Sequence, residues 1–140
     1  MLRPLQLGDD APWKQRFRAA TIMSAQIADA APTRGLVTSN LSGLSQLYAW
    51  DVASGTLRQL TYRPDGARFG RISPDGKYVL YLDDTRGNEI GHYVRVPFEG
   101  GPPQDVTPQL PPYSPAGLDV SYSGNLIGIT VALPGGLHLY

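Results

Sequence analysis

The sequence has 140 residues, of which 41% are hydrophobic, and its 12 Lys and Arg balance its 12 Asp and Glu. This length suits one domain with a real core, and the zero net charge gives no overall attraction to nucleic acid or to an anionic membrane. The lack of cysteine excludes disulfides and thiolate metal sites. The start, MLRPLQLGDDAPWKQRF, has no apolar leader, and no later run approaches the roughly 20 apolar residues of a spanning helix, so we expect a cytoplasmic protein with no membrane partner.

Short β-branched and aromatic runs, separated by 16 glycines and 13 prolines, predict an all-β protein. The segment PWKQRFRAA, residues 12–20, has a proline suited to a first helical position and is the only predicted helical turn. In chain order, the predicted strands are residues 21–28, 35–40, 46–52, 56–61, 67–72, 77–82, 91–98, 104–107, 118–122, 125–133 and 136–140.

A four-residue corner, Ser73-Pro74-Asp75-Gly76, precedes the sixth predicted strand. Proline presets φ at the second position of a tight turn, aspartate hydrogen-bonds locally, and glycine takes the left-handed conformation. The corner is therefore predicted to be a hairpin loop. The run that follows, residues 78–82, shows no polar alternation, which indicates that both of its faces are covered by other sheets.

The chain also repeats itself. The segments IADAAPTRGLVTSN, RISPDGKYVLYLDD and DVSYSGNLIGITVA align so that Ile27, Ile72 and Val120 are equivalent, and Thr61 likewise matches Thr107. A period of about 40 to 45 residues with four short strands is typical of a propeller blade. We therefore predict an all-β fold, a partial β-propeller of about two and a half four-stranded blades.

By this register, residues 1–21 form an N-terminal segment and residues 22–140 the partial propeller. Blade 1 takes about residues 22–61, blade 2 about 67–107, and an incomplete blade 3 about 117–140, which suggests a fragment. The alternative is an eleven-stranded Greek-key sandwich, which explains the strands but not the repeated order of loop types. Uncovered apolar faces on the flanking sheets predict self-association.

The loop DDTRGNE gathers the candidate binding residues Asp83, Asp84, Arg86, Asn88 and Glu89. Their oxygen atoms would suit a hard cation such as calcium, but the spacing does not match an EF-hand. Arg86 in their midst favours internal pairing with a carboxylate, together with local turns of the Asx type. We therefore predict no metal and no cofactor.

No catalytic residue is predicted. A Gly-x-Ser-x-Gly elbow is absent, since LSGLSQ around Ser45 lacks the second glycine. His92 and His138 lie within predicted strands, where a half-buried imidazole with one backbone partner is the ordinary role. The chain alone is therefore not expected to be an enzyme.

Aromatic residues alternate along several predicted strands and favour packing between blades over stacking on a ligand; these are Tyr48, Trp50, Tyr78, Tyr81 and Tyr93. The proline-rich stretch 100–117 is interpreted as a rigid crossing between blades rather than a polyproline ligand. The basic cluster WKQRFR stands beside two aspartates and is too small to indicate a nucleic-acid partner.

The segment RISPDGKYVLYLDDTRGNEIGHYVRVPFEGGPPQDVTP, residues 71–108, resembles one blade of the N-terminal β-propeller of the prolyl oligopeptidase family of serine peptidases. It is similar also to propellers of the TolB type. The motifs that carry the resemblance are SPDGKYVLYL, the loop with Gly87-Asn88-Glu89, and the closing DVTP. Upstream, APWKQRFRAATIMSAQIA and QLYAWDVASGTLRQLT are similar to the opening blade of acylaminoacyl-peptidase-like members.

This resemblance implies a non-catalytic propeller portion of a serine peptidase. It would sit over an α/β-hydrolase domain absent from this chain and gate the access of peptide substrates, with residues 83–89 lining the opening. The alternative is a stand-alone TolB-like propeller repeat protein that binds partner proteins through loops on one face. The lack of an apolar leader weighs against a periplasmic role for that alternative.

Overall fold

A computed structural model describes residues 4–140 and confirms an all-β chain with one short helix near its start. Within the described residues, no helix has the length and apolar character to cross a membrane. The elements are α1 (Pro12–Arg18), β1 (Ile22–Ala28), β2 (Ala31–Ser39), β3 (Gln46–Asp51), β4 (Leu57–Gln59), β5 (Gly70–Ile72), β6 (Tyr78–Asp84), β7 (Gly91–Pro97), β8 (Gln104–Asp105), β9 (Ser114–Val120), β10 (Ile127–Leu133) and β11 (Gly136–Leu139).

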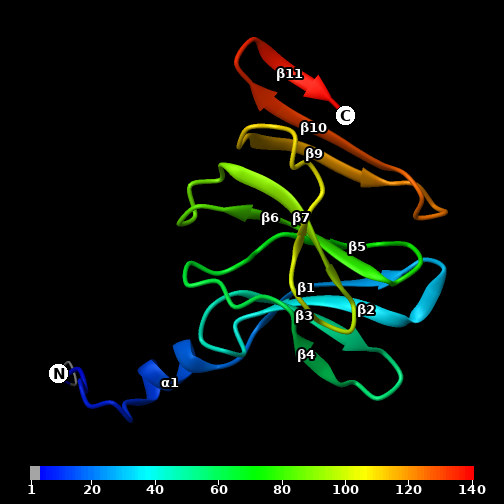
Figure 1. The fold of residues 1–140 in the computed structure, drawn as a ribbon. Coiled ribbons are helices and arrows are strands. Elements are labelled where there is room, and N and C mark those ends of the chain that lie inside the picture. The colour runs from blue at the N-terminus through cyan, green and yellow to red at the C-terminus, as the bar shows by residue number, and fades with distance from the viewer. Residues whose placement is uncertain (1–3) are drawn as a thin grey trace.

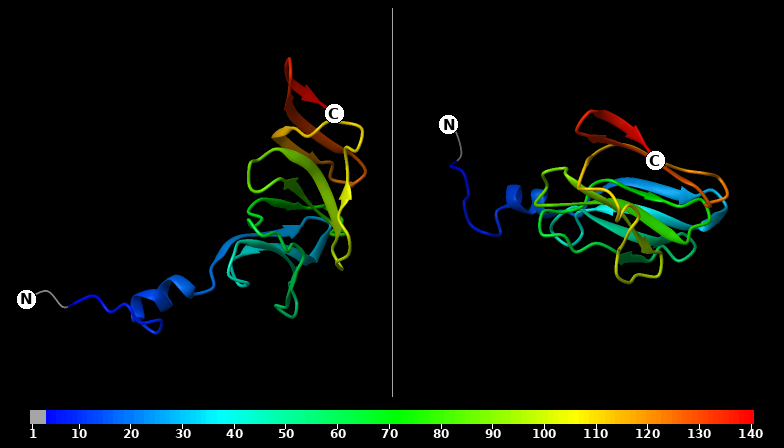
Figure 2. Two further views of the ribbon diagram at one scale, coloured as in Figure 1. Left: turned by 60° about the vertical axis from the view of Figure 1, so that its left-hand side comes forward. Right: turned by 45° about the horizontal axis from the view of Figure 1, so that its top comes forward.

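The strands form three antiparallel sheets in which chain neighbours pair. Sheet 1 has the order β1-β2-β3-β4, sheet 2 the order β5-β6-β7-β8, and sheet 3 holds β9, β10 and β11. The three sheets are stacked face to face in chain order, and the segment with α1 projects away from the stack (Figures 1 and 2). The arrangement is that of consecutive propeller blades, so the predicted fold class is confirmed.

The corner at residues 73–76 joins β5 to β6 as predicted. Gly76 has φ +67°, and its N–H donates to Ser73 O over 2.8 Å. Asp75 Oδ1 accepts hydrogen bonds from Ser73 Oγ at 2.6 Å and from the Lys77 N–H at 3.1 Å. Partial burial acts to raise the pKa of Asp75, but these hydrogen bonds outweigh it and hold the pKa below its usual value.

The repeat alignment holds for Ile72 and Val120 but is one residue off in sheet 1, where Ala28 rather than Ile27 takes the equivalent position. Ile72 and Val120 each end the first strand of their sheet, and Ile27 stands one residue before the end of β1. Ile72 and Val120 are buried, whereas Ile27 is 49% exposed. The difference has a simple cause: Ala28 on the next position of β1 packs toward sheet 2, so Ile27 faces the side of sheet 1 that no sheet covers.

Two apolar clusters fill the spaces between the sheets. The cluster between sheets 1 and 2 includes Leu36, Leu47, Val79, Tyr81 and Val96, among others. The smaller one, between sheets 2 and 3, is built on Tyr93, Tyr113, Ile129 and Val131. Strand β6 contributes to both clusters through alternate residues, which is why its sequence lacks polar alternation.

Several predictions about the strands are wrong in detail. Strand β2 begins at Ala31 rather than at residue 35, and β4 and β5 have three residues each rather than the predicted six. Strand β9 starts at Ser114 rather than at residue 118, so Pro115 lies inside a strand. The edge position of β9 in sheet 3 permits this, because one side of an edge strand needs no N–H for pairing. Tyr48 and Trp50 do not lie between blades, since they alternate with Leu47 and Ala49 and so face away from sheet 2.

Candidate functional site

The loops at one end of the sheets bring the predicted binding residues into one region. The loop between β6 and β7, residues 85–90, lies beside the connection from sheet 1 to sheet 2, residues 60–69. In Figure 1, both lie at the left-hand ends of the strands. Chain segments from two consecutive sheets therefore meet here.

Arg63 anchors the acidic start of this loop. Its side chain is 15% exposed, it pairs with Asp83, and its Nη2 lies 2.9 Å from Asp84 Oδ1. It also donates to the Asp84 backbone carbonyl. One guanidinium thus contacts both carboxylates and ties the start of this loop to the connection between sheets 1 and 2.

The loop is closed by its own polar groups. Asp84 Oδ2 accepts the Glu89 N–H at 2.9 Å, and Asn88 Oδ1 accepts the Ile90 N–H at 3.0 Å, which is the Asx turn expected from the sequence. Arg86 and Glu89 have φ values of +54° and +58°, in the left-handed region that such side chains rarely adopt. The loop therefore has a fixed shape, set by local hydrogen bonds and by Arg63.

The internal ion pair was predicted for the wrong arginine. Arg63 rather than Arg86 pairs with the two aspartates. The reason is topological: Arg63 belongs to the preceding inter-sheet connection, which the stacking brings alongside β6, and the local sequence gives no signal of this pairing. Within residues 4–140, no group of three His, Asp or Glu side chains is placed to hold a metal ion.

A groove that the sequence did not indicate runs beside this loop. A cavity of about 280 Å³ lies between residues 65–69 and the loop, and a second of about 410 Å³ lies between sheets 2 and 3. Phe69, Leu82 and Glu89 line both cavities, so the two form a continuous surface that we call the Phe69 groove.

The floor of the groove is apolar, and its most exposed member is Phe69. The Phe69 side chain is 84% exposed, whereas Leu80 and Tyr93 below it are 1% and 9% exposed. Burial raises the pKa of the Tyr93 phenol, with Tyr113 adding to the effect, so this side chain is neutral at physiological pH. Arg68 and Glu89 supply charges along the groove.

The structure places the two histidines apart from this groove. His92 was predicted to have a backbone partner, but its Nδ1 lies 2.9 Å from Asp105 Oδ2, and its ring lies 5.4 Å from that of Tyr113. The side chain is 19% exposed, so the half-buried placement is as predicted. His138 lies on β11 with its ring 6.4 Å from that of Tyr140.

Among solved structures, the chain is similar to TolB from Acinetobacter baumannii, with a TM-score of 0.50 and 19% sequence identity. The match covers 84% of this chain and 32% of the TolB chain, so the chain spans about a third of that structure. At this identity the similarity concerns the fold alone, and it agrees with a partial propeller. No protein-family model and no curated protein matches the sequence.

Proposed function

We propose that the chain is a non-catalytic propeller module that binds a partner protein through the Phe69 groove. The observation that carries this proposal is the 84% exposed phenyl ring of Phe69, which stands at the junction of two cavities. An exposed large apolar side chain next to an apolar floor is a typical protein-binding feature.

An extended segment of the partner fits this surface better than a compact ligand does. The groove continues from residues 65–69 to residues 115–118 at the start of sheet 3, so it offers an elongated contact. An apolar side chain of the segment would pack on Phe69 and Leu82, while Arg68 and Glu89 would contact its polar groups. The hydrogen bonds that close the loop beside the groove hold its shape, which keeps the entropy cost of binding low.

A selection from a random dodecapeptide library on the immobilised 140-residue chain tests this function. We expect selected peptides to carry an aromatic or large aliphatic residue. Their affinity, measured by fluorescence anisotropy, should fall about tenfold or more in Phe69→Ala, because truncating one central aromatic anchor typically costs about 2 kcal/mol.

Tyr122→Ala is the matched control. Tyr122 is also exposed, at 73%, but it lies in the turn between β9 and β10 at the other end of the sheets. This variant should bind the selected peptides as the unaltered chain does. Equal affinity of Phe69→Ala and the unaltered chain, or equal losses in both variants, would contradict the proposal.

A second candidate is the propeller portion of a prolyl-oligopeptidase-like serine peptidase. It is supported by the conjunction of SPDGKYVLYL with the Gly87-Asn88-Glu89 loop, and by the position of Gly87 and Glu89 on the groove. In this role the groove would face the path of peptide substrates toward a hydrolase domain.

The reading frame beyond Tyr140 distinguishes the two candidates. Further repeats followed by a Gly-x-Ser-x-Gly motif and an α/β-hydrolase pattern would support the peptidase role. A stop codon followed by unrelated sequence would exclude it. The 140-residue chain alone should not hydrolyse chromogenic aminoacyl substrates, and hydrolysis that is lost on replacing one of its serines would contradict the non-catalytic assignment.

A further inference from the structure

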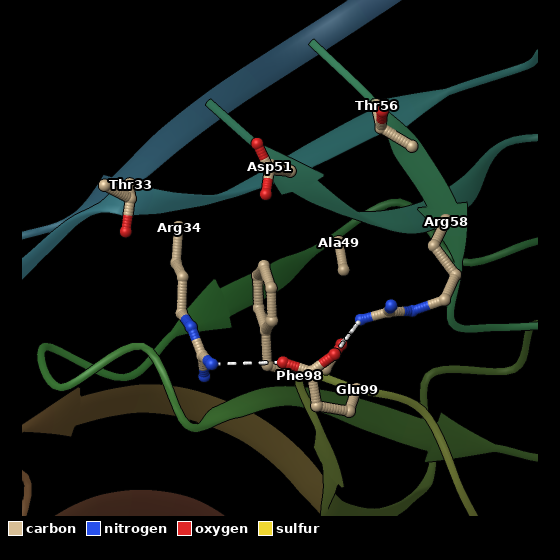
Figure 3. A pocket seen from close by; sticks show the side chains of 8 residues that line it. All are labelled: Thr33, Arg34, Ala49, Asp51, Thr56, Arg58, Phe98 and Glu99. Carbon is tan, nitrogen blue, oxygen red and sulfur yellow. Dashed lines mark hydrogen bonds and ion pairs between the residues drawn. The ribbon is translucent and has the colours of Figure 1, made fainter. Parts of the chain in front are cut away.

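A separate cavity of about 280 Å³ lies at the opposite ends of the strands from the Phe69 groove. Its walls come from β2, β3 and β4 of sheet 1, from Thr56 just before β4, and from residues 98–99 that follow β7 of sheet 2 (Figure 3). Two arginines, Arg34 and Arg58, reach from sheet 1 toward this junction, and no part of the Phe69 groove is shared with it.

The two guanidinium groups share one carboxylate. Arg34 Nη2 lies 3.0 Å from Glu99 Oε1, and Arg58 Nη2 lies 3.1 Å from Glu99 Oε2. Figure 3 shows the carboxylate between the two cations, with one oxygen turned to each. The two positive charges face the negative charge of Glu99 and that of Asp51 on the opposite wall, so a further carboxylate would bind to the arginine pair by taking the place of Glu99.

Contacts other than Glu99 hold both arginines in position. The guanidinium carbons of Arg34 and Arg58 lie 4.7 Å and 5.7 Å from the centre of the Phe98 ring. Arg34 Nη1 donates to Gly76 O over 3.1 Å, and Arg58 donates to the Phe98 carbonyl. The two arginines would therefore keep their positions if the Glu99 side chain moved away. They form a preorganised anion site.

Glu99 itself is weakly held. Its side chain is 64% exposed, and ion pairs that water can reach are readily replaced. The next two residues, Gly100 and Gly101, have φ values of +89° and +131°, and nothing lies within 4 Å of a Cβ position at Gly100. This part of the chain has room to carry the Glu99 carboxylate away from the arginines.

We propose that Arg34 and Arg58 bind the carboxylate of an acidic side chain in a peptide, and that Glu99 occupies this site in the absence of the peptide. The far wall of the cavity favours a peptide over a phosphate. Asp51 lies there, and its carboxylate accepts hydrogen bonds from Ser54 N at 2.8 Å and Ser54 Oγ at 2.9 Å. The negative charge of Asp51 repels a multiply charged anion such as phosphate. Its carboxylate can instead accept a hydrogen bond from a backbone N–H of a peptide.

Titration of the 140-residue chain with acetyl-Ala-Ala-Glu-Ala-Ala-amide, followed by the arginine Nε–H signals in NMR spectra, tests the proposal. Glu99→Gln removes the competing charge and should tighten binding about tenfold, the effect expected of one charge-assisted contact. Glu99→Gln combined with Arg34→Gln should lose this gain, because one of the two guanidinium donors is missing.

Arg95→Gln, added to Glu99→Gln, is the matched control. Arg95 lies on β7, where its Nε donates to Gln104 Oε1 over 3.2 Å, and it lines neither this cavity nor the Phe69 groove. Its replacement should leave peptide binding unchanged. The peptide with Gln in place of Glu should not bind. Equal binding of both peptides, or no tightening in a Glu99→Gln variant that retains its β-sheet circular dichroism spectrum, would overturn the proposal.

The source of the carboxylate is tested separately. The Gln peptide with an unblocked carboxyl terminus presents the same group from the main chain. If it bound to Glu99→Gln as tightly as the Glu peptide does, the assignment to an acidic side chain would be wrong. Because none of these residues lines the Phe69 groove, Phe69→Ala should leave this binding intact, which separates this proposal from the function proposed above.

Discussion

Sheet 2 is covered on both faces, but its two interfaces are built differently. Toward sheet 1, aliphatic side chains interlock closely: a Cβ added at Gly70 would lie 2.6 Å from Leu47 Cδ1, and Gln26 Nε2 donates to Gly70 O over 2.8 Å. Toward sheet 3, one aromatic residue dominates. Tyr113 is 1% exposed, and its hydroxyl accepts the Tyr93 N–H at 2.7 Å and lies 2.8 Å from Thr107 Oγ1.

This difference shows how one repeated unit can stack by two kinds of interaction. The first interface relies on non-directional burial, which tolerates small shifts and scales with the apolar area. The second relies more on a buried hydrogen-bond network, which fixes the position of Tyr113 and is costly to leave incomplete. Substitutions in the two interfaces should therefore lower the free energy of unfolding by different amounts. Their effects should also extend over different parts of the chain.

The largest effect should come from Leu47→Ala, in the interface between sheets 1 and 2. Leu47 is 0% exposed, so its truncation loses buried apolar surface and leaves a cavity. We expect the free energy of unfolding to fall by about 2 to 5 kcal/mol in chemical denaturation. Leu137→Ala on the uncovered face of sheet 3, where Leu137 is 69% exposed, should change it by less than about 0.5 kcal/mol. A loss at Leu47 no larger than that control would contradict the role of this interface.

The next largest effect should come from Tyr113→Phe, in the interface between sheets 2 and 3. The ring remains, but the buried Tyr93 N–H loses its partner, and the Thr107 hydroxyl keeps only its contact to Asp105 Oδ1 at 3.3 Å. We expect a loss of about 1 to 3 kcal/mol. Hydrogen exchange should show faster amide exchange mainly in β9, β10 and β11. Tyr48→Phe, which removes a contact to Ser42 on the other side of sheet 1, is the control and should leave sheet 3 protected. Uniform acceleration over all three sheets would show that the interface does not act separately.

Two equivalent turns allow a finer comparison. Gly76 and Gly124 have φ values of +67° and +74°, so an alanine at either position is strained by about 1 to 2 kcal/mol. A Cβ at Gly76 would also lie 2.9 Å from Arg34 Cδ and 3.0 Å from Ala31 Cβ, whereas one at Gly124 meets Asp75 at an ordinary 3.4 Å.

Gly76→Ala should therefore lower the melting temperature more than Gly124→Ala. Both variants carry the same strain in the turn, so the difference between them measures the contact of the β5–β6 turn with sheet 1. Equal shifts in the two variants would mean that Arg34 and Ala31 adjust without cost, and that this turn adds nothing to the interface.

Much of the fold could be predicted because local and repeated signals agree. The turn at residues 73–76 and the doubly buried strand β6 follow from turn chemistry and periodicity, which act over a few residues. The equivalent threonines, Thr61 and Thr107, are both buried, at 1% and 2% exposure, with side-chain hydrogen bonds near the end of each four-stranded sheet. The comparison of repeats thus indicated that these two threonines have equivalent places in the packing, which neither segment alone would indicate.

The candidate site was less predictable, because it depends on contacts between sheets. Phe69 lies in the predicted strand 67–72 and was expected to belong to the sheet, but β5 has only three residues and begins at Gly70. Tyr113 lies in a proline-rich stretch interpreted as a crossing, where nothing local marks it as a buried residue. The pairing of Arg63 with the two aspartates of β6 likewise depends on the stacking of the sheets. The sequence around these aspartates does not indicate which basic residue will lie beside them.

The smallest effect concerns the two interfacial tyrosines in alkaline solution. Burial raises the pKa of Tyr81, against an opposing effect of Arg63, and burial together with Tyr113 raises the pKa of Tyr93, both above the ordinary value of 10.0. The folded chain therefore holds these protons more tightly than the unfolded chain does. Their contribution to stability is complete below pH 10 and is lost as the pH rises through the two raised pKa values.

Denaturation at several pH values should show this loss above about pH 10, and Tyr81→Phe and Tyr93→Phe should each reduce its steepness. The two variants report on different interfaces, because Tyr81 packs toward sheet 1 and Tyr93 toward sheet 3. Tyr62→Phe, which replaces a ring that is 78% exposed, is the control. If the Tyr62 variant altered the alkaline slope as much as the other two, the loss would stem from general charge repulsion, and the interfaces would not differ from the surface in this respect.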